Sequence, residues 1–286
     1  MISVQTNISS LLAQENLRVN SDFQAQTIQR LTSGYRINQS GDDAAGLAVA
    51  NAYRSSVTEL TQGVRNANDG VSTLQIIDGG ISNITKMLDR AKTLATESAS
   101  DTFTGDRATL NNEYTDLKNE INRQAANIGL VTGGTNLKDL SVYIGGGDAT
   151  NSAVTIALST ATVDSTSLGL THTLDTAANA KLAIADLNGT PAGVVGGVPV
   201  PAVAGALSKI GTIQGVVGSG QNKLAYATEL AQSQISSFSA AQSRIRDADM
   251  AAEAANLTKS QVLQQASIAA MAQANSAPQA VLALLK

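Results

Sequence analysis

Both ends of this 286-residue chain carry the pattern of a long amphipathic helix that continues almost to the terminal residue. The apolar stripe at the N-terminal end consists of Val4, Ile8, Leu11, Leu12, Val19, Phe23 and Leu31. The stripe at the C-terminal end has a four–three spacing and consists of Leu257, Gln261, Gln264, Ile268, Met271, Asn275, Pro278, Leu282 and Leu285. Because the termini of soluble domains ordinarily fray in water, apolar residues kept up to Leu285 predict that both ends contact partners.

Both stripes are thin. Much of each consists of Ala, Gln and Ser, and a buried methylene contributes only about 0.8 kcal/mol. Aromatic residues make up 3% of the chain and tryptophan is absent, so bulky core-filling side chains are scarce. Two such helices would form a marginal core alone. We therefore expect them to assemble with many copies of the same chain.

Composition and charge exclude several classes of function. The net charge of −4, with scattered basic residues, argues against nucleic-acid binding, which requires clustered Lys and Arg to neutralise phosphates. The absence of cysteine excludes disulfides and thiolate metal sites. We expect no cleaved signal peptide, because the first residues have neither a basic start nor an uninterrupted apolar run. The uncharged stretch 189–207 contains prolines and glycines and is predicted to be a loop, not a membrane span.

The patterns along the chain are arranged like mirror images around its middle. A glycine-punctuated polar segment at 33–43 predicts a linker after the N-terminal helix. Helical stripes follow at 57–94 and 110–128, with a break near 100–107, which predicts an antiparallel helix pair. The helical pattern returns at 221–245 and leads into the C-terminal helix.

Two local features refine this plan. Asp42 and Asp43 stand where a new helix would begin, where a negative charge is favourable. Gly79-Gly80 is expected to weaken or kink the first long helix. In the middle of the chain, residues 141–158 have the alternation of a hairpin, and residues 175–187 predict one short helix.

Several segments of the chain resemble the signature segments of bacterial flagellins. They are residues 33–50 (SGYRINQSGDDAAGLAVA), 60–70 (LTQGVRNANDG), 243–249 (SRIRDAD), 256–266 (NLTKSQVLQQA) and the ending from Ala272 to Lys286. The resemblance covers roughly residues 1–140 and 206–286, and its specificity comes from several long motifs in the same order. Residues 141–170 are similar to the first outer hairpin of that family, less distinctively.

The resemblance implies a mainly α fold: an elongated antiparallel helical rod with the terminal helices paired as a coiled coil, plus a small β-hairpin and loop-rich outer insert. The implied parts are an inner coiled-coil domain at 1–34 and 250–286, a helical rod or shell domain at 35–140 and 207–249 with a hairpin at 141–160, and a small variable outer segment at 161–206.

The resemblance also implies a function without catalysis, cofactor or metal. A flagellin is exported unfolded by the flagellar type III route and polymerises outside the cell into the filament used for swimming. The implied partners are further copies of the chain, the flagellar cap and hook-associated proteins, and an export chaperone; no nucleic acid and no membrane is implied. The implied assembly residues are Val4, Ile8, Leu11, Phe23, Leu31, Ile268, Met271, Leu282 and Leu285. The implied linker and intersubunit residues are Arg36, Asp42, Asp43, Arg244 and Asp247.

A second implied partner is an immune receptor. Residues 88–95 resemble the helix that Toll-like receptor 5 contacts in receptor-activating flagellins, and Arg90, Leu94 and Glu113 match residues of that contact. Thr93 replaces the usual acidic residue, which implies a reduced potency. The same positions also fit a plainer interpretation, in which they only pack between subunits.

Residues that could carry chemistry have plain explanations. His172, the only histidine, lies in a Thr-rich segment and is interpreted as a surface residue. Residues 145–148 lack the Lys-Ser/Thr of a phosphate loop and predict a turn. Asp247 and Asp249, beside two arginines, fit a solvated face or a subunit contact equally well. Ser and Thr residues between 150 and 176 fit either O-linked glycosylation or an unmodified surface.

Three other classes of function fit the sequence less well. A hook–filament junction protein shares the terminal helices of flagellin, but the near-complete matches in the linker and C-terminal motifs disfavour it. An amphipathic protein of lipid surfaces would need Lys and Arg enrichment on its polar faces, which this chain lacks. An enzyme has no supporting set of residues.

Overall fold

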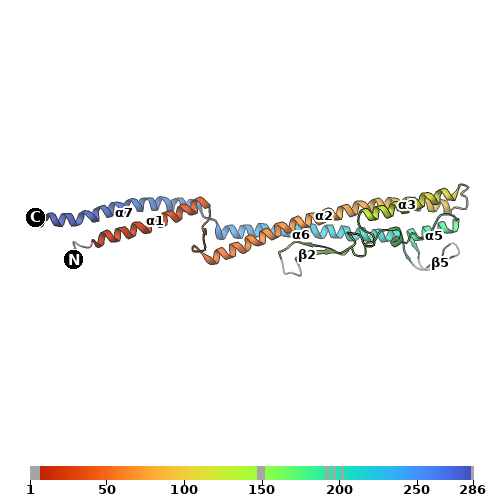
Figure 1. Ribbon diagram of the computed structural model, residues 1–286, viewed down its shortest axis with the longest axis horizontal. Coiled ribbons are helices and arrows are strands. Elements are labelled where there is room, and N and C mark those ends of the chain that lie inside the picture. The colour runs from red at the N-terminus through yellow and green to blue at the C-terminus, as the bar shows by residue number, and fades with distance from the viewer. Residues whose placement is uncertain (1–6, 147–151, 191–192, 196–197, 201–202, 285–286) are drawn as a thin grey trace. The chain divides into compact units, whose positions relative to one another are not determined.

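The computed structural model describes residues 7–146, 152–190, 193–195, 198–200 and 203–284. Its main helices are α1 (Ile8–Ser33), α2 (Ala44–Ala99), α3 (Arg107–Asn127), α4 (Ser165–Leu168), α5 (Ala177–Asn188), α6 (Ala206–Arg246) and α7 (Met250–Leu284) (Figure 1). Its strands are β1 (Leu140–Tyr143), β2 (Ala153–Ile156), β3 (Gly189–Thr190), β4 (Gly193–Val195), β5 (Val198–Val200) and β6 (Val203–Ala204). The predicted mainly α fold is confirmed.

The chain divides into two compact units. The terminal unit consists of Met1–Val57 and Ser236–Lys286, and the central unit consists of Thr58–Ile235. This division differs from the predicted one, which separated the linker from the terminal helices at residues 34 and 250. The linker belongs to the terminal unit because it is hydrogen-bonded to the residues between α6 and α7. The described residues between 161 and 206 fall within the central unit.

The predicted break near 100–107 agrees closely with the structure, whereas α6 begins at Ala206, well before the predicted start at 221. Helix α2 ends at Ala99, and α3 begins after Asp106, whose side chain accepts a hydrogen bond from the N–H of Ala108 at 2.9 Å. The Arg107 side chain donates to the carbonyl oxygens of Ser98 and Ser100, at 3.1 and 3.0 Å, and so satisfies acceptors at the end of α2. Helix α2 is continuous through Gly79-Gly80. Gly80 is buried against Ile128, which explains why a residue without a side chain is needed there.

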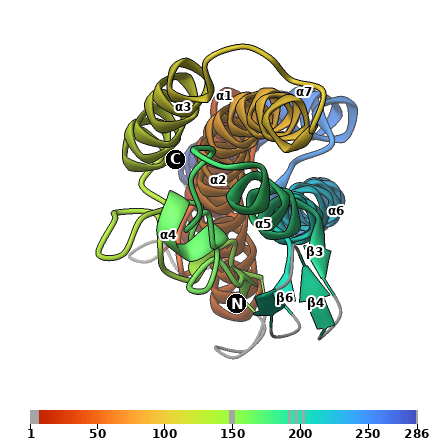
Figure 2. The same ribbon diagram turned by 90° about the vertical axis from the view of Figure 1, so that its right-hand side faces the viewer.

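The central unit has a conventional hydrophobic core. Its large, fully buried side chains are Leu60, Leu74, Ile77, Ile81, Ile84, Leu88 and Leu94 of α2, Tyr114 and Ile121 of α3, Leu168 of α4, and Leu130 and Leu158 of the connecting segments. Helices α5 and α6 contribute further buried residues, and Figure 2 shows α3, α5 and α6 arranged around α2. The spacing of three and four along α2 places this apolar stripe on one face of the helix.

A β-hairpin lies against the helices of the central unit. Strands β1 and β2 pair antiparallel, with Val142 opposite Val154. Val142 and Ile144 are buried and Tyr143, between them, is exposed, as the period of two requires. The backbone of Ile144 approaches Gly63 of α2 so closely that a β-carbon at Gly63 would clash with the Ile144 carbonyl. The predicted hairpin is confirmed.

The stretch predicted to be a loop, 189–207, also contains strands. Strand β3 pairs with β6, and β4 pairs with β5, both antiparallel. The prediction of a loop was wrong because proline and glycine were read as turn signals only, whereas proline is also tolerated on the edge of a small sheet. The predicted short helix near residues 175–187 is present as α5.

Candidate functional site: the terminal helix pair and its clasp

Local side-chain chemistry sets both ends of α1. Asn7 stands before the first turn, and its side-chain oxygen accepts a hydrogen bond from the N–H of Ser10 at 3.2 Å. Gly34 ends the helix in the left-handed conformation, with φ of 75°, and its N–H donates to the Arg30 carbonyl at 2.9 Å. A residue with a β-carbon would be strained at this φ, so glycine ends the helix at the start of the linker.

Helices α1 and α7 pack against one another in antiparallel directions (Figure 1). The residues of α1 that are buried or half-buried at a spacing of three and four are Ser10, Ala13, Leu17, Asn20, Gln24, Thr27 and Leu31. The corresponding residues of α7 are Glu253, Leu257, Ser260, Gln264, Ser267, Met271 and Ala274. This heptad spacing is that of a coiled coil, and we call these two sets of residues the seam. The seam consists mainly of small and polar side chains.

The large apolar residues that were expected to form this contact mostly lie outside the seam. The side chains of Ile8, Leu11 and Ile268 are 71%, 58% and 54% exposed. Phe23, Leu31 and Met271 are half-buried. Val4, Leu285 and the side chain of Leu282 lie outside the described residues. The predicted C-terminal stripe is displaced by one residue at several positions, because small residues such as Ser260 and Ser267 allow the helices to approach more closely than Gln261 and Ile268 would.

Three polar contacts cross the seam in antiparallel order. The side-chain amide of Asn7 donates to the Ala274 carbonyl at 2.7 Å. The amide of Asn20 donates to the Ser267 hydroxyl at 3.0 Å. Arg30 Nη1 lies 3.5 Å from Glu253 Oε1, and these two side chains are 24% and 10% exposed. The most buried of the three contacts is therefore the ion pair next to the linker.

The linker is joined to the residues between α6 and α7 by a short antiparallel contact, which we call the clasp. The N–H of Arg36 donates to the Arg246 carbonyl at 2.6 Å, and the N–H of Ala248 donates to the Gly34 carbonyl at 2.9 Å. These bonds enclose the bridge between Tyr35 and Asp247. The Arg36 guanidinium adds a hydrogen bond to the Ile245 carbonyl at 3.0 Å. The clasp therefore joins the N-terminal and C-terminal halves of the chain through the backbone.

Side chains reinforce the clasp. The Arg246 guanidinium lies 4.1 Å from the centre of the Tyr35 ring, in a cation–π arrangement. The Ser243 hydroxyl donates to Asp247 Oδ2 at 2.5 Å. Arg244 is exposed in the last turn of α6, where a positive charge complements the helix dipole. Of the predicted linker residues, Arg36 and Asp247 thus take part directly in the clasp.

Asp42 and Asp43 have different roles. The carboxylate of Asp42 accepts hydrogen bonds from the N–H groups of Asn38 and Gln39, at 3.0 and 3.1 Å, and from the Gln26 amide of α1 at 3.1 Å. The two backbone hydrogen bonds are the main reason why the pKa of Asp42 is lowered. Asp43 accepts from the N–H of Gly46 at 2.8 Å and so caps α2. Asp42 folds the linker, and only Asp43 serves the start of the helix.

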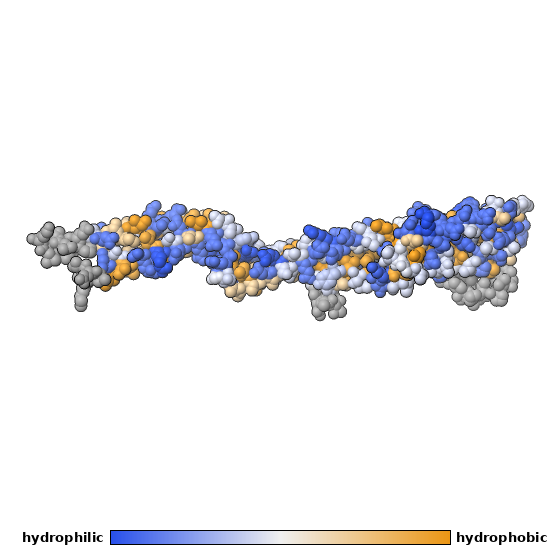
Figure 3. Space-filling view, in the orientation of Figure 1, coloured by the Kyte–Doolittle hydropathy of each residue, from blue (hydrophilic) through white to orange (hydrophobic). Residues whose placement is uncertain are grey.

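Sequence reasoning missed Arg30, Glu253, Tyr35 and Arg246, although the first two are the most buried charged pair of this site. The apolar stripe in the sequence predicted that the large side chains would form the contact between the two helices, whereas most of them lie on the outer faces. A signal was available in the heptad of small residues, which predicts a closely packed seam. On the visible face of the terminal unit, hydrophobic and hydrophilic surface alternate (Figure 3), as expected when apolar side chains are left outside the seam.

The predicted receptor residues lie in the central unit and do not form one surface. Arg90 of α2 and Glu113 of α3 form an exposed ion pair, with Nη2 and Oε1 2.6 Å apart. Leu94 is fully buried in the core. The expectation that Leu94 contacts a receptor directly is therefore corrected, because in this conformation its side chain packs inside the unit.

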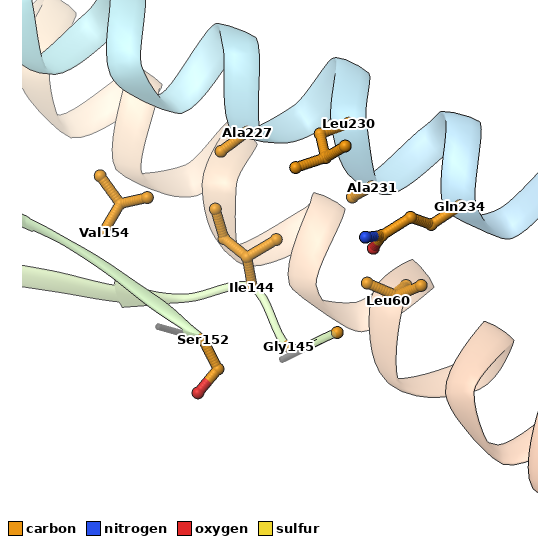
Figure 4. A pocket seen from close by; sticks show the side chains of 10 residues that line it. Leu60, Ile144, Gly145, Ser152, Val154, Ala227, Leu230, Ala231 and Gln234 are labelled. Carbon is orange, nitrogen blue, oxygen red and sulfur yellow. The ribbon is translucent and has the colours of Figure 1, made fainter. Parts of the chain in front are cut away.

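The central unit also contains an apolar pocket of about 210 Å³ between the hairpin, α2 and α6. Figure 4 shows Leu60, Ile144, Val154 and Leu230 around it, with Gln234 and Ser152 as its polar side chains. None of the residues that line the pocket carries a titratable group. The pocket thus has the character of a packing defect beside the hairpin and not that of a catalytic site.

Other residues with possible chemistry are accounted for by local structure. His172 Nδ1 lies 2.8 Å from Asp186 Oδ2, and this carboxylate also accepts hydrogen bonds from the backbone of Thr171 and His172. Within the described part of the chain, His, Cys, Asp and Glu side chains form no group of three or more that could hold a metal ion. The described helices include none that is both long and apolar enough to cross a membrane.

The fold and the site define a class of protein: a mainly helical subunit whose terminal helices pair through small residues and leave large apolar side chains exposed. The comparisons with known proteins agree. The bacterial flagellin N-terminal helical region matches residues 4–129, and the bacterial flagellin C-terminal helical region matches residues 200–285. The chain belongs to the bacterial flagellin family.

Relatives match over the whole length. A flagellin of Halalkalibacterium halodurans is 31% identical, and the flagellar filament 30.7 kDa core protein of Treponema maltophilum is 33% identical, each over 99% of both chains. A solved structure, the crystal structure of Bacillus cereus flagellin, is 22% identical and covers 61% of this chain and 88% of that chain, with a TM-score of 0.39. The chain is thus a non-enzymatic structural subunit of the flagellar filament used in motility, and these relatives do not favour a hook–filament junction protein.

Proposed function

We propose that the exposed apolar side chains of α1 and α7 are the contacts through which copies of this chain assemble into the filament. The observation that carries the proposal is the exposure of Ile8, Leu11 and Ile268 on helices that already have a partner. Large apolar side chains gain free energy when they leave water. Repeated contact between different patches on successive copies generates an open helical polymer when the rotation from copy to copy does not close into a ring.

We propose that the clasp holds together the two chain segments that connect the terminal helices α1 and α7 to the long helices α2 and α6. Arg36 holds the linker by backbone and side-chain hydrogen bonds to Arg246 and Ile245, and Asp247 lies opposite Tyr35 in the same contact. Asp42 and Asp43 fold the linker and start α2. Arg244 is exposed on the same segment. In a filament, it would be available to a neighbouring copy. We therefore assign the intersubunit role to Arg244 and the linker role to Arg36, Asp42, Asp43 and Asp247.

The thin seam also supports a proposal about export and partners. A seam of small residues stabilises a helix pair weakly, so we infer that the terminal helices are unpaired before assembly and order when copies meet, which allows transport as an unfolded chain by the flagellar type III route. The same exposed helices are the surfaces we assign to the export chaperone and to the cap and hook-associated proteins. The mature filament would then lie outside the cell.

Substitution of exposed residues tests the assembly contacts. Leu11→Ser and Ile268→Ser should leave the thermal unfolding of the central unit unchanged and lower the yield of sedimentable filaments by about tenfold, because each copy in the polymer loses the same apolar contact. Asn16→Ser is the matched control, since Asn16 is also exposed on α1 but is polar. Filament yields equal to that of the unsubstituted chain for both apolar variants would contradict the proposal.

We also propose that the surface around Arg90 and Glu113 is contacted by Toll-like receptor 5. The supporting observation is that these two side chains, far apart in sequence, meet on the outside of the central unit. Arg90→Ala should reduce activation of a receptor reporter cell by monomeric protein. Arg123→Ala is the matched control, because Arg123 forms a similar exposed ion pair with Glu120. No activation by the unsubstituted monomer at high dose would end this proposal.

A further inference from the structure

Apolar packing in the seam gives α1 little preference for α7 over another helix as its partner. Its fully buried members outside the ion pair are Ala13, Thr27 and Ser260, which differ little in size. Large side chains such as Val19 and Val262 are exposed, so they do not lock into holes on the opposite helix. A helix of this kind could pair with a second α1, or slide by one turn along α7, with little loss of apolar contact. Something other than apolar packing must select the partner.

We propose that the ion pair between Arg30 and Glu253 selects α7 as the partner of α1 and sets the register of the two helices. Glu253 is the one acidic residue in α7. Asp249, one turn before Glu253, already accepts hydrogen bonds from the N–H groups of Ala251 and Ala252. Arg30 therefore finds a carboxylate that is not already used as a helix cap in a single register only. The acidic residues of α1, Glu15 and Asp22, are exposed and bind Arg18. A second α1 therefore offers no free carboxylate at the seam, and a shifted α7 leaves both charges without a partner.

The geometry of the Arg30–Glu253 ion pair fits a role in selecting the partner helix better than a role in stabilising the helix pair. Arg30 and Glu253 meet through one nitrogen and one oxygen at 3.5 Å, while Arg30 Nε and Glu253 Oε2 are buried without a partner among the described residues. A buried pair that is satisfied so incompletely adds little net stability, since desolvation offsets the attraction. Removing one member is costly all the same, because it leaves a buried charge alone. Polar residues at otherwise apolar seams fix register and partner in coiled coils for the same reason.

The pairing is assigned to helices of the same chain. The backbone hydrogen bond between Gly34 and Ala248 lies four residues beyond Arg30 and five before Glu253, so the clasp brings the two charges together within one copy. The inference rests on the proposed function, because it concerns the helices that the assembly contacts use. It adds that the orientation of the outer apolar faces depends on this pair.

Charge reversal tests the selection. Arg30→Glu and Glu253→Arg should each lower the yield of sedimentable filaments by about tenfold or more, because like charges then meet in the seam. The double variant, with the two charges exchanged, should recover to within about threefold of the unsubstituted chain, since the coupling between the two positions is restored. Unfolding of the central unit, followed by circular dichroism, should stay the same in every variant. A double variant as poor as the worse single variant would overturn the proposal.

Mixing the two single variants tests whether the pair forms within one chain. If it does, a mixture of Arg30→Glu and Glu253→Arg copies assembles no better than either alone. If the mixture recovers as the double variant does, the helices pair between copies, and the assignment to one chain is wrong.

Cysteine cross-links read the register directly, because the chain has no cysteine of its own. Asn20→Cys with Ser267→Cys should form a disulfide within one chain in filaments, whereas Asn20→Cys with Leu263→Cys, one turn away, should not. Adding Arg30→Glu should reduce the preference for the first pair by about tenfold; an unchanged preference would overturn the proposal. Failure of the unsubstituted chain to form filaments would instead contradict the proposed function, so the two failures are distinguishable.

Discussion

The two units of this chain use apolar side chains in opposite ways. The central unit buries most of its large apolar residues, among them Ile81 and Leu88, and leaves a few, such as Ile76 and Leu230, exposed. The terminal unit buries Ala13, Thr27 and Ser260 and leaves Leu11 among the exposed residues. The first arrangement is that of a unit that is stable by itself. The second leaves large apolar side chains exposed, and under the proposed function further copies cover them.

The largest expected effect compares one substitution in the two units. Leu88→Ala should lower the free energy of unfolding of the central unit by about 2–5 kcal/mol, because it removes fully buried atoms and leaves a cavity. Leu11→Ala should change the unfolding of the monomer by less than about 0.5 kcal/mol, since its side chain is exposed. Chemical denaturation of the monomer measures both. A large loss for Leu11→Ala would mean that the terminal unit has a closed core after all.

A smaller effect is expected from two glycines of α2. Gly63→Ala should destabilise the central unit by roughly 1–3 kcal/mol, because the new methyl group would clash with the Ile144 carbonyl and force the hairpin away from the helix. Gly79→Ala is the matched control: a β-carbon there has no atom within 4 Å, so higher helix propensity should stabilise by up to about 1 kcal/mol. Thermal unfolding measures both, and equal signs for the two variants would contradict this account of the hairpin contact.

The smallest effect concerns pH and the terminal unit. Hydrogen bonds to the ionised carboxylate lower the pKa of Asp42, so its contribution to stability is present above the unfolded pKa of roughly 3.9 and is lost as the pH falls from there through the lowered value. Amide exchange at Asn38 and Gln39 in filaments should therefore accelerate at low pH relative to the clasp amides of Arg36 and Ala248.

Asp42→Asn provides the control for this pH dependence. It should remove the extra acid sensitivity of the Asn38 and Gln39 amides and raise their exchange near neutral pH. The free energy involved is small because the carboxylate is partly open to water and is screened. If the variant kept the same acid response, the response would have to come from other carboxylates.

Much of the central unit could be predicted from the sequence. The stripe of α2 from Leu60 to Leu94 is regular and made of large residues, so its period identifies the buried face without other information. The hairpin was recognisable from the alternation around Val142 and Val154. The strands near Val194 and Val203 were missed, because two- and three-residue strands leave too short a pattern and depend on contacts distant in sequence.

The candidate site was predicted in outline and missed in detail. The linker motifs included Arg36 and Asp247. In the structure both residues lie in the clasp, where the N-terminal and C-terminal halves of the chain are in contact. The seam was misplaced by a residue at several positions of α7, because the four–three spacing was aligned on large residues such as Ile268 and so included Gln261 and Ile268 in place of Ser260 and Ser267. Leu94 was assigned to a surface, although the tertiary packing of α2 against the rest of the central unit buries it.

By itself, the sequence determined that this protein is mainly helical, that apolar stripes run along both terminal helices, and that it belongs with filament subunits. These properties follow from periodicity and from motifs that are local in the chain. Only the tertiary structure decided which face of each terminal helix meets its partner, and that Arg30 meets Glu253 there. The physical reason is that a helix offers several faces of similar hydrophobicity, and the choice among them depends on side-chain size and charge on a second helix more than 200 residues away.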